Sequence, residues 1–111
     1  PRQVGLKQAM EIALLGERFD VSRARELGLV NRVVPRDDLE AETLKLARRL
    51  ATGPSTALAH TKALLNQSFD NSLEAQLHAE QMSFVDCATK PDFAEGLTGF
   101  FEKRKPVYNK N

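Results

Sequence analysis

Apolar residues recur every three or four positions along most of this chain, which predicts a succession of amphipathic helices. The expected helices cover residues 5–15, 20–28, 36–51, a stretch around 57–65, 70–88 and 89–104. Residues 29–34 are the one convincing β-prone run, and no second run could pair with them. The pattern therefore predicts an α-rich fold with one short β-prone segment near residues 29–34.

Polar residues and glycines mark where several of these helices should begin and end. Asp20 or Ser22 is expected to cap the second helix, and Thr89 is expected to cap the last one. Gly96 and Gly99 lie inside the last helix, where each costs about 1 kcal/mol relative to alanine. Since glycines three apart let another backbone approach, we expect a close helix contact there.

Composition narrows the class of protein. The 111 residues contain 16 Lys and Arg against 15 Asp and Glu, and a net charge of +1 argues against nucleic acid as the main partner. Cys87 is the single cysteine, so the chain has neither an internal disulfide nor zinc-ligand spacing, and a reducing, cytoplasmic setting is expected. No apolar run is long enough to span a bilayer, so no membrane partner is expected. A start at Pro1 and an unpaired strand suggest a fragment.

The common catalytic motifs are absent from the sequence. There is no Gly-Gly pair, no G-x-S-x-G and no P-loop. His60 and His78 are expected to be structural or solvated. For Glu80, which falls between apolar positions of its helix, two readings stay open: a carboxylate paired with a cation of a neighbouring helix, or a general base with a raised pKa.

The C-terminal run G-F-F-E-K-R-K-P, residues 99–106, places two adjacent aromatics before three consecutive cations, with Glu102 between them. One reading is an ordinary helix end, with Phe101 in the core and Arg104 and Lys105 complementing the helix dipole. The other is a place where a ring that carries phosphates binds. Phe100 and Lys103 are three apart, so both are expected on one helical face.

The blocks E-L-G-L-V-N-R-V-V-P (26–35) and E-G-L-T-G-F-F-E-K-R-K-P (95–106), with T-K-x-L-L-N and S-L-E-A-Q-L-x-x-E between them, resemble the C-terminal part of the crotonase superfamily. The resemblance covers essentially the whole chain. It implies a spiral ββα core whose end is residues 1–35, followed by a helical trimerisation region over residues 36–111. The catalytic core, with its glycine-rich oxyanion hole and catalytic glutamates, would be missing from this chain.

The resemblance also implies a function. Its members are enoyl-CoA hydratases and isomerases acting on acyl-CoA thioesters in fatty-acid or aromatic-acid metabolism. Phe100 would lie against the adenine of coenzyme A, Lys103 would contact phosphate, and Arg104 is a third candidate contact. The coenzyme A thioester would be substrate, with no covalently bound cofactor, no metal and no catalytic residue in this chain. The chain would form a trimer or dimer of trimers, and alone it should be inactive.

Other questions stay open at the level of sequence. The chain could instead be an autonomous, non-catalytic helical assembly module. Segments 53–68 and 72–96 look closest to ring-epoxide isomerases of phenylacetyl-CoA breakdown, but hydration, double-bond isomerisation and ring-epoxide isomerisation all remain candidate reactions. The coenzyme A contact could be made within one subunit or to its neighbour.

Overall fold

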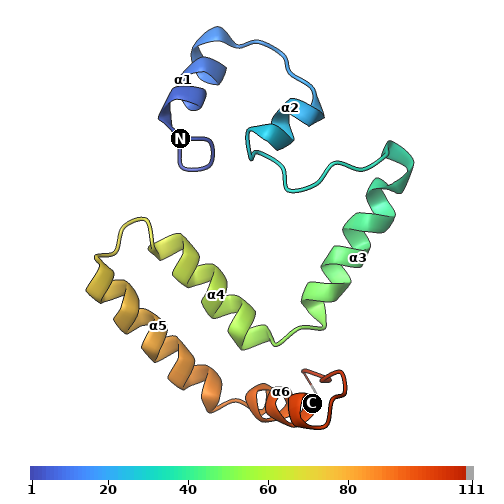
Figure 1. The fold of residues 1–111 in the computed structure, drawn as a ribbon, viewed down its shortest axis with the longest axis vertical. Helices are drawn as coiled ribbons and strands as arrows, with labels where there is room; N and C mark the ends of the chain where they lie inside the picture. The colour runs from blue at the N-terminus through green and yellow to red at the C-terminus, as the bar shows by residue number, and fades with distance from the viewer. Residues whose placement is uncertain (110–111) are drawn as a thin grey trace. The chain divides into compact units, whose positions relative to one another are not determined.

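The computed structural model describes residues 1–109, and all the regular structure in this part of the chain is helical (Figure 1). In order, the elements are α1 (Leu6–Leu15), α2 (Val21–Glu26), a 3-10 turn (Arg36–Asp38), α3 (Leu39–Ala51), α4 (Ser55–Gln67), α5 (Leu73–Ala88) and α6 (Pro91–Phe101). The predicted α-rich fold class is confirmed.

The β-prone run at residues 29–34 forms no strand within residues 1–109. A strand is stabilised by the backbone hydrogen bonds of a neighbouring strand, and the described residues supply no neighbour. The carbonyl of Asn31 instead accepts a hydrogen bond from Nη1 of Arg25, at 2.9 Å. The run thus has the composition of a strand without the partner that would complete it.

Backbone contacts divide the chain into two compact units, residues 1–42 and 43–111, and α3 crosses the division. In the first unit, Asp20 caps α2 by accepting a hydrogen bond from the Arg23 N–H at 2.9 Å. Leu27, directly after α2, is 6% exposed and is the one buried apolar side chain among the described residues. The first of the two expected caps is therefore correct.

In the second unit, α4 and α5 lie side by side and antiparallel (Figure 1). Ser72 caps α5 by accepting from the Ala75 N–H at 3.2 Å, and Gln76 of α5 donates to the Leu64 carbonyl of α4 at 3.5 Å. Helix α6 also contacts α5. The last helix begins at Pro91 rather than at a Thr89 cap, because Thr89 ends α5 by donating to the Asp86 carbonyl at 2.7 Å.

Helix α6 ends in a Schellman motif. The Lys103 N–H donates to the Phe100 carbonyl at 3.3 Å, and the Arg104 N–H donates to the Gly99 carbonyl at 3.0 Å. This pairing requires a left-handed residue after the helix, and Lys103 takes that position with φ 54°.

The end of α2 shows the same motif with glycine in that position. Gly28, at φ 75°, donates to the Arg25 carbonyl, and Leu29 donates to the Ala24 carbonyl. Glycine adopts the left-handed conformation without steric cost, whereas a residue with a Cβ is strained there by about 1–2 kcal/mol. Lys103 therefore stands where glycine would be the more stable choice.

The two glycines of α6 face the chain's own C-terminal segment and not another helix, which corrects the sequence-based expectation. A Cβ on Gly99 would lie 3.2 Å from the Arg104 carbonyl oxygen and 3.2 Å from Cβ of Pro106. A Cβ on Gly96 would lie 3.4 Å from the hydroxyl of Tyr108. The chain turns at Lys103 and runs back along α6, and the small residues make room for it.

The two glycines should respond differently to alanine. Gly96→Ala should raise the free energy of unfolding by about 0.5–1 kcal/mol, because helix propensity improves and the Tyr108 hydroxyl can move slightly. Gly99→Ala should lower it by about 1 kcal/mol, because backbone and a proline ring must be displaced. Urea denaturation of both variants checks this, and a stabilising Gly99→Ala would show that the segment is not held against α6.

Candidate functional site

The C-terminal segment is fastened to α6 by one carboxylate. Oε1 of Glu95 accepts hydrogen bonds from Nη1 of Arg104 at 2.6 Å and from the Val107 N–H at 2.9 Å. Oε2 accepts from Nη2 of Arg104 at 3.4 Å. The Glu95 side chain is only 16% exposed. A single acid therefore holds the returning segment at two points.

Further along the segment, Asn109 makes a second attachment. Its N–H donates to Oδ1 of Asp92 at 2.9 Å, and its side-chain amide donates to the Gly53 carbonyl at 2.8 Å. Asn109 has φ 56°, a conformation that asparagine tolerates better than most residues. These bonds tie the segment to the start of α6 and to the loop between α3 and α4.

Of the predicted coenzyme A contacts, Arg104 forms ion pairs with two carboxylates of the chain itself. Besides Glu95, its Nε donates to Glu102 at 2.6 Å. Hydrogen bonds to Glu95 and then to Glu102 raise the pKa of the Arg104 guanidinium above its ordinary value. Because two carboxylates surround it, Arg104 contributes little net positive charge to the site.

Lys103 is exposed, and within residues 1–109 its ammonium forms no ion pair. It lies beyond the end of α6, so the expectation that it shares a helical face with Phe100 is wrong. The two are linked through the Schellman motif, in which the Lys103 N–H reaches the Phe100 carbonyl. The position of Lys103 is therefore set by the backbone turn after α6 and not by helical spacing.

The two aromatic rings at the end of α6 are open. Phe100 is 77% exposed and Phe101 76% exposed. Their ring centroids are 5.6 Å apart at an interplanar angle of 77°, an edge-to-face pair. In the described chain Phe101 is not part of a core, and both rings are accessible to a flat ligand or to another surface.

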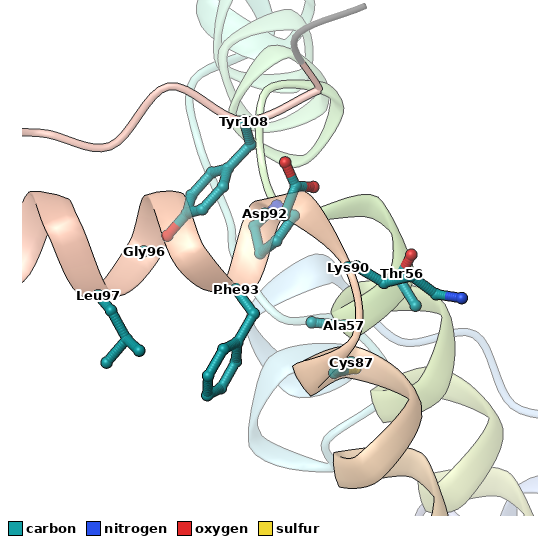
Figure 2. A pocket seen from close by; sticks show the side chains of 10 residues that line it. Thr56, Ala57, Cys87, Lys90, Asp92, Phe93, Gly96, Leu97 and Tyr108 are labelled. Carbon is teal, nitrogen blue, oxygen red and sulfur yellow. The ribbon is translucent and has the colours of Figure 1, made fainter.

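A pocket of about 360 Å³ lies where α4, α5, α6 and the C-terminal segment meet (Figure 2). Its lining is mainly apolar, and Figure 2 shows the Tyr108 ring lying over Gly96 with Phe93 and Leu97 on the same helix. Lys90 and Thr56 lie at one end of it. Sequence patterns do not reveal this pocket, because its residues come from four separate segments.

A polar cluster that the sequence did not reveal joins α4 to the end of α5. Oδ2 of Asp86 lies 2.9 Å from Nε2 of His60, and Oδ1 lies 2.9 Å from Nζ of Lys90. The hydrogen bond with His60, and then that with Lys90, lowers the pKa of Asp86 below its ordinary value near 3.8. His60 is thus a structural residue with an acidic partner.

The carboxylate of Glu80 is not paired with a cation of a neighbouring helix within residues 1–109, and its interpretation as a general base stays a prediction. Glu80 is exposed, and its Oε1 accepts a hydrogen bond from Gln76 of the same helix at 3.0 Å. No ion pair with a cation is found for it within residues 1–109. Its position on the apolar stripe of α5 does not bury it, because Leu77, on the same stripe, is itself 55% exposed.

No group of three or more His, Cys, Asp and Glu side chains in residues 1–109 is placed to hold a metal ion. In the same residues, every helix is too short or too polar to cross a bilayer.

Known proteins similar to this chain are named as enoyl-CoA hydratases or as a related acyl-CoA isomerase. The sequence pattern of the enoyl-CoA hydratase/isomerase family matches residues 1–111. A protein of Rhodobacter capsulatus named as a probable enoyl-CoA hydratase is 39% identical over 97% of this chain and 42% of its own length. The 1,2-epoxyphenylacetyl-CoA isomerase of Escherichia coli is 34% identical, over 97% of this chain and 41% of its own length.

Solved structures agree with the sequence comparison. The crystal structure of an enoyl-CoA hydratase from Polaromonas sp. JS666 superimposes with a TM-score of 0.90 at 35% identity, covering 97% of this chain and 42% of the other. The chain belongs to the enoyl-CoA hydratase/isomerase family. Its helices match the C-terminal helical region of the crotonase fold, and it spans about two fifths of the length of these relatives.

The Asp86 cluster generates a prediction about pH. Because the pKa of Asp86 is lowered in the folded chain, its stabilising contribution is present above the unfolded value near 3.8 and is lost as pH falls through the lowered value. Asp86→Asn should therefore reduce the free energy of unfolding at pH 6 and approach wild type below about pH 3.8. Urea denaturation at fixed protein concentration measures this.

The matched control is His60→Ala, in which Asp86→Asn should have a smaller effect, because the two residues share one hydrogen bond. An Asp86→Asn effect that is equal at pH 6 and at pH 3 would contradict the role given to the ionised carboxylate.

Proposed function

We propose that this chain acts as part of an enoyl-CoA hydratase/isomerase-family enzyme of the cytoplasm that uses acyl-CoA thioesters of fatty-acid or aromatic-acid metabolism. In that enzyme it supplies subunit association and part of the coenzyme A site. The observation that carries the second role is Lys103, exposed, without an ion pair in the described chain and held in a left-handed turn beside two open phenylalanine rings.

The chemistry of this corner suits the nucleotide end of coenzyme A. Adenine is flat and stacks on an aromatic face, and the exposed Phe100 offers one. A phosphate forms charge-assisted hydrogen bonds with an ammonium group, and the Lys103 ammonium is accessible. We place Arg104 in a supporting role, because Glu95 and Glu102 already occupy its guanidinium.

The left-handed conformation of Lys103 supports a role in binding. The same type of turn after α2 has Gly28 in the left-handed position. Lysine at that position after α6 therefore lowers the free energy of unfolding relative to glycine. Strain at one residue is common where a side chain must be aimed at a ligand. Since the chain has no Gly-Gly pair, the proposal assigns the oxyanion hole and the chemical step to a part of the family fold outside these 111 residues.

The association role follows from the uncovered apolar surface. On α5 alone, Leu73 is 71% exposed and Leu77 55% exposed, and they lie one turn apart on one face. Apolar patches of this kind mark contact surfaces. We propose that a second copy of the chain, in a trimer or dimer of trimers, covers part of it.

Replacing Lys103 should weaken binding of coenzyme A esters without changing the chemical step. In the enzyme that contains this chain, Lys103→Ala should raise KM about tenfold with kcat nearly unchanged, because a charge-assisted hydrogen bond is worth roughly 1.5–3 kcal/mol and is made in both the ground and transition states. Lys103→Gly should weaken binding equally while raising the free energy of unfolding by about 1 kcal/mol.

The control substrate is the pantetheine thioester, which lacks adenine and the nucleotide phosphates. With this substrate, the KM and kcat of both Lys103 variants should match those of wild type. Equal losses on the two substrates, or no loss on either, would show that Lys103 has no part in binding the nucleotide.

The association role predicts that the chain sediments as a trimer or larger at micromolar concentration. Leu73→Glu with Leu77→Glu should raise the dissociation constant by about a hundredfold or more, because burial of a leucine is worth about 1.5–3 kcal/mol. The matched control is Glu74→Gln, which lies on another face and should leave the mass unchanged. A folded wild-type monomer in sedimentation would contradict the association role and, with it, the alternative of an assembly module.

A further inference from the structure

We infer that Glu95 is a positioning residue for Lys103, holding the left-handed turn that presents the ammonium to a phosphate of the substrate nucleotide. This inference rests on the proposed function. It concerns a residue that would touch no substrate atom, because its carboxylate is directed to Arg104 and Val107.

The placement of Glu95 sets it apart from the other charged groups of the segment. Its side chain is 16% exposed, compared with 39% for Arg104 and 57% for Glu102. Among residues 1–109, it accepts hydrogen bonds from the guanidinium of Arg104 and from the Val107 N–H. A carboxylate that is largely withdrawn from water and satisfied in this way fixes its partners more firmly than an exposed pair does.

These bonds hold the chain on the C-terminal side of Lys103. Arg104 directly follows Lys103 in the chain, and Val107 lies four residues after it. Glu95 therefore binds the chain immediately after Lys103. On the N-terminal side, the hydrogen bonds of the Schellman motif fix Phe100 and Gly99. Lys103 is thus constrained from both directions.

The hydrogen bonds of Glu95 act against the strain at Lys103. Left-handed backbone disfavours lysine by about 1–2 kcal/mol, so a released turn would relax toward negative φ and redirect the side chain. Glu95 opposes that relaxation, because its bonds to Arg104 and Val107 require the chain to return along α6. Losing Glu95 should therefore act on phosphate binding through Lys103.

The test uses the enzyme containing this chain, with KM and kcat measured on a coenzyme A ester and on the matching pantetheine thioester. Glu95→Ala should raise KM for the coenzyme A ester about as much as Lys103→Ala, roughly tenfold, and leave the pantetheine thioester unchanged. Glu95→Gln keeps one acceptor oxygen, so its KM for the coenzyme A ester should lie between those of Glu95→Ala and wild type. The double variant Glu95→Ala, Lys103→Ala should be no worse than Lys103→Ala alone.

Asp92→Ala is the matched control, since Asp92 also holds a backbone N–H of the segment, but at Asn109, well beyond the turn. It should leave KM for the coenzyme A ester unchanged. Trypsin cleavage after Lys103 and Arg104, followed by intact mass, gives a readout that is independent of substrate, and Glu95→Ala should speed it.

The outcomes separate the two proposals. If Lys103→Ala weakens binding and Glu95→Ala does not, the positioning role is overturned while the proposed function stands. If Lys103→Ala has no effect on either substrate, both fail. Equal losses on the two substrates for Glu95→Ala and Glu95→Gln, or losses that add to those of Lys103→Ala, would make Glu95 a general structural residue and overturn the inference.

Discussion

The return of the C-terminal segment along α6 is the constraint on which the candidate site depends. It is possible because Gly99 has no side chain, so the Arg104 carbonyl and the Pro106 ring can lie where a Cβ would be. Once the chain has turned, Arg104 and Val107 reach Glu95, and Lys103 is left in a left-handed conformation at the outside of the turn. Close approach of backbone to a helix thereby places Arg104 against its carboxylate partner and leaves Lys103 at the turn.

The three consecutive cations of this segment are alike in the sequence and different in the structure. Arg104 is neutralised by Glu95 and Glu102, whereas Lys103 forms no ion pair within the described residues. The difference between the two residues has a physical basis, since a guanidinium presents several N–H donors in a planar fork and an ammonium is a compact point charge. It also explains why a positively charged run need not act as one surface.

The second feature of the molecule is the small amount of apolar surface that the chain covers by itself. Leu27 is the one buried apolar side chain in residues 1–109, while large apolar residues on every long helix remain more than a third exposed. Hydrophobic burial is the main stabilising contribution to folding, so helices with these faces need a further surface against them. Polar links such as Asp86 with His60 set how neighbouring helices align, but they do not replace that burial.

The sequence by itself determined the helices and the family, and it narrowed the cap of α2 to Asp20 or Ser22, because periodicity, capping and motif order are properties of neighbouring residues in the chain. It predicted Phe100, Lys103 and Arg104 as contacts, and these roles stay predictions. Only the tertiary structure decided that Gly99 faces the chain's own end, that Asp86 pairs with His60, and that Lys103 lies outside α6. Each of these depends on a contact between residues whose meeting is set by where the chain turns, and a left-handed lysine is a turn that local propensity disfavours.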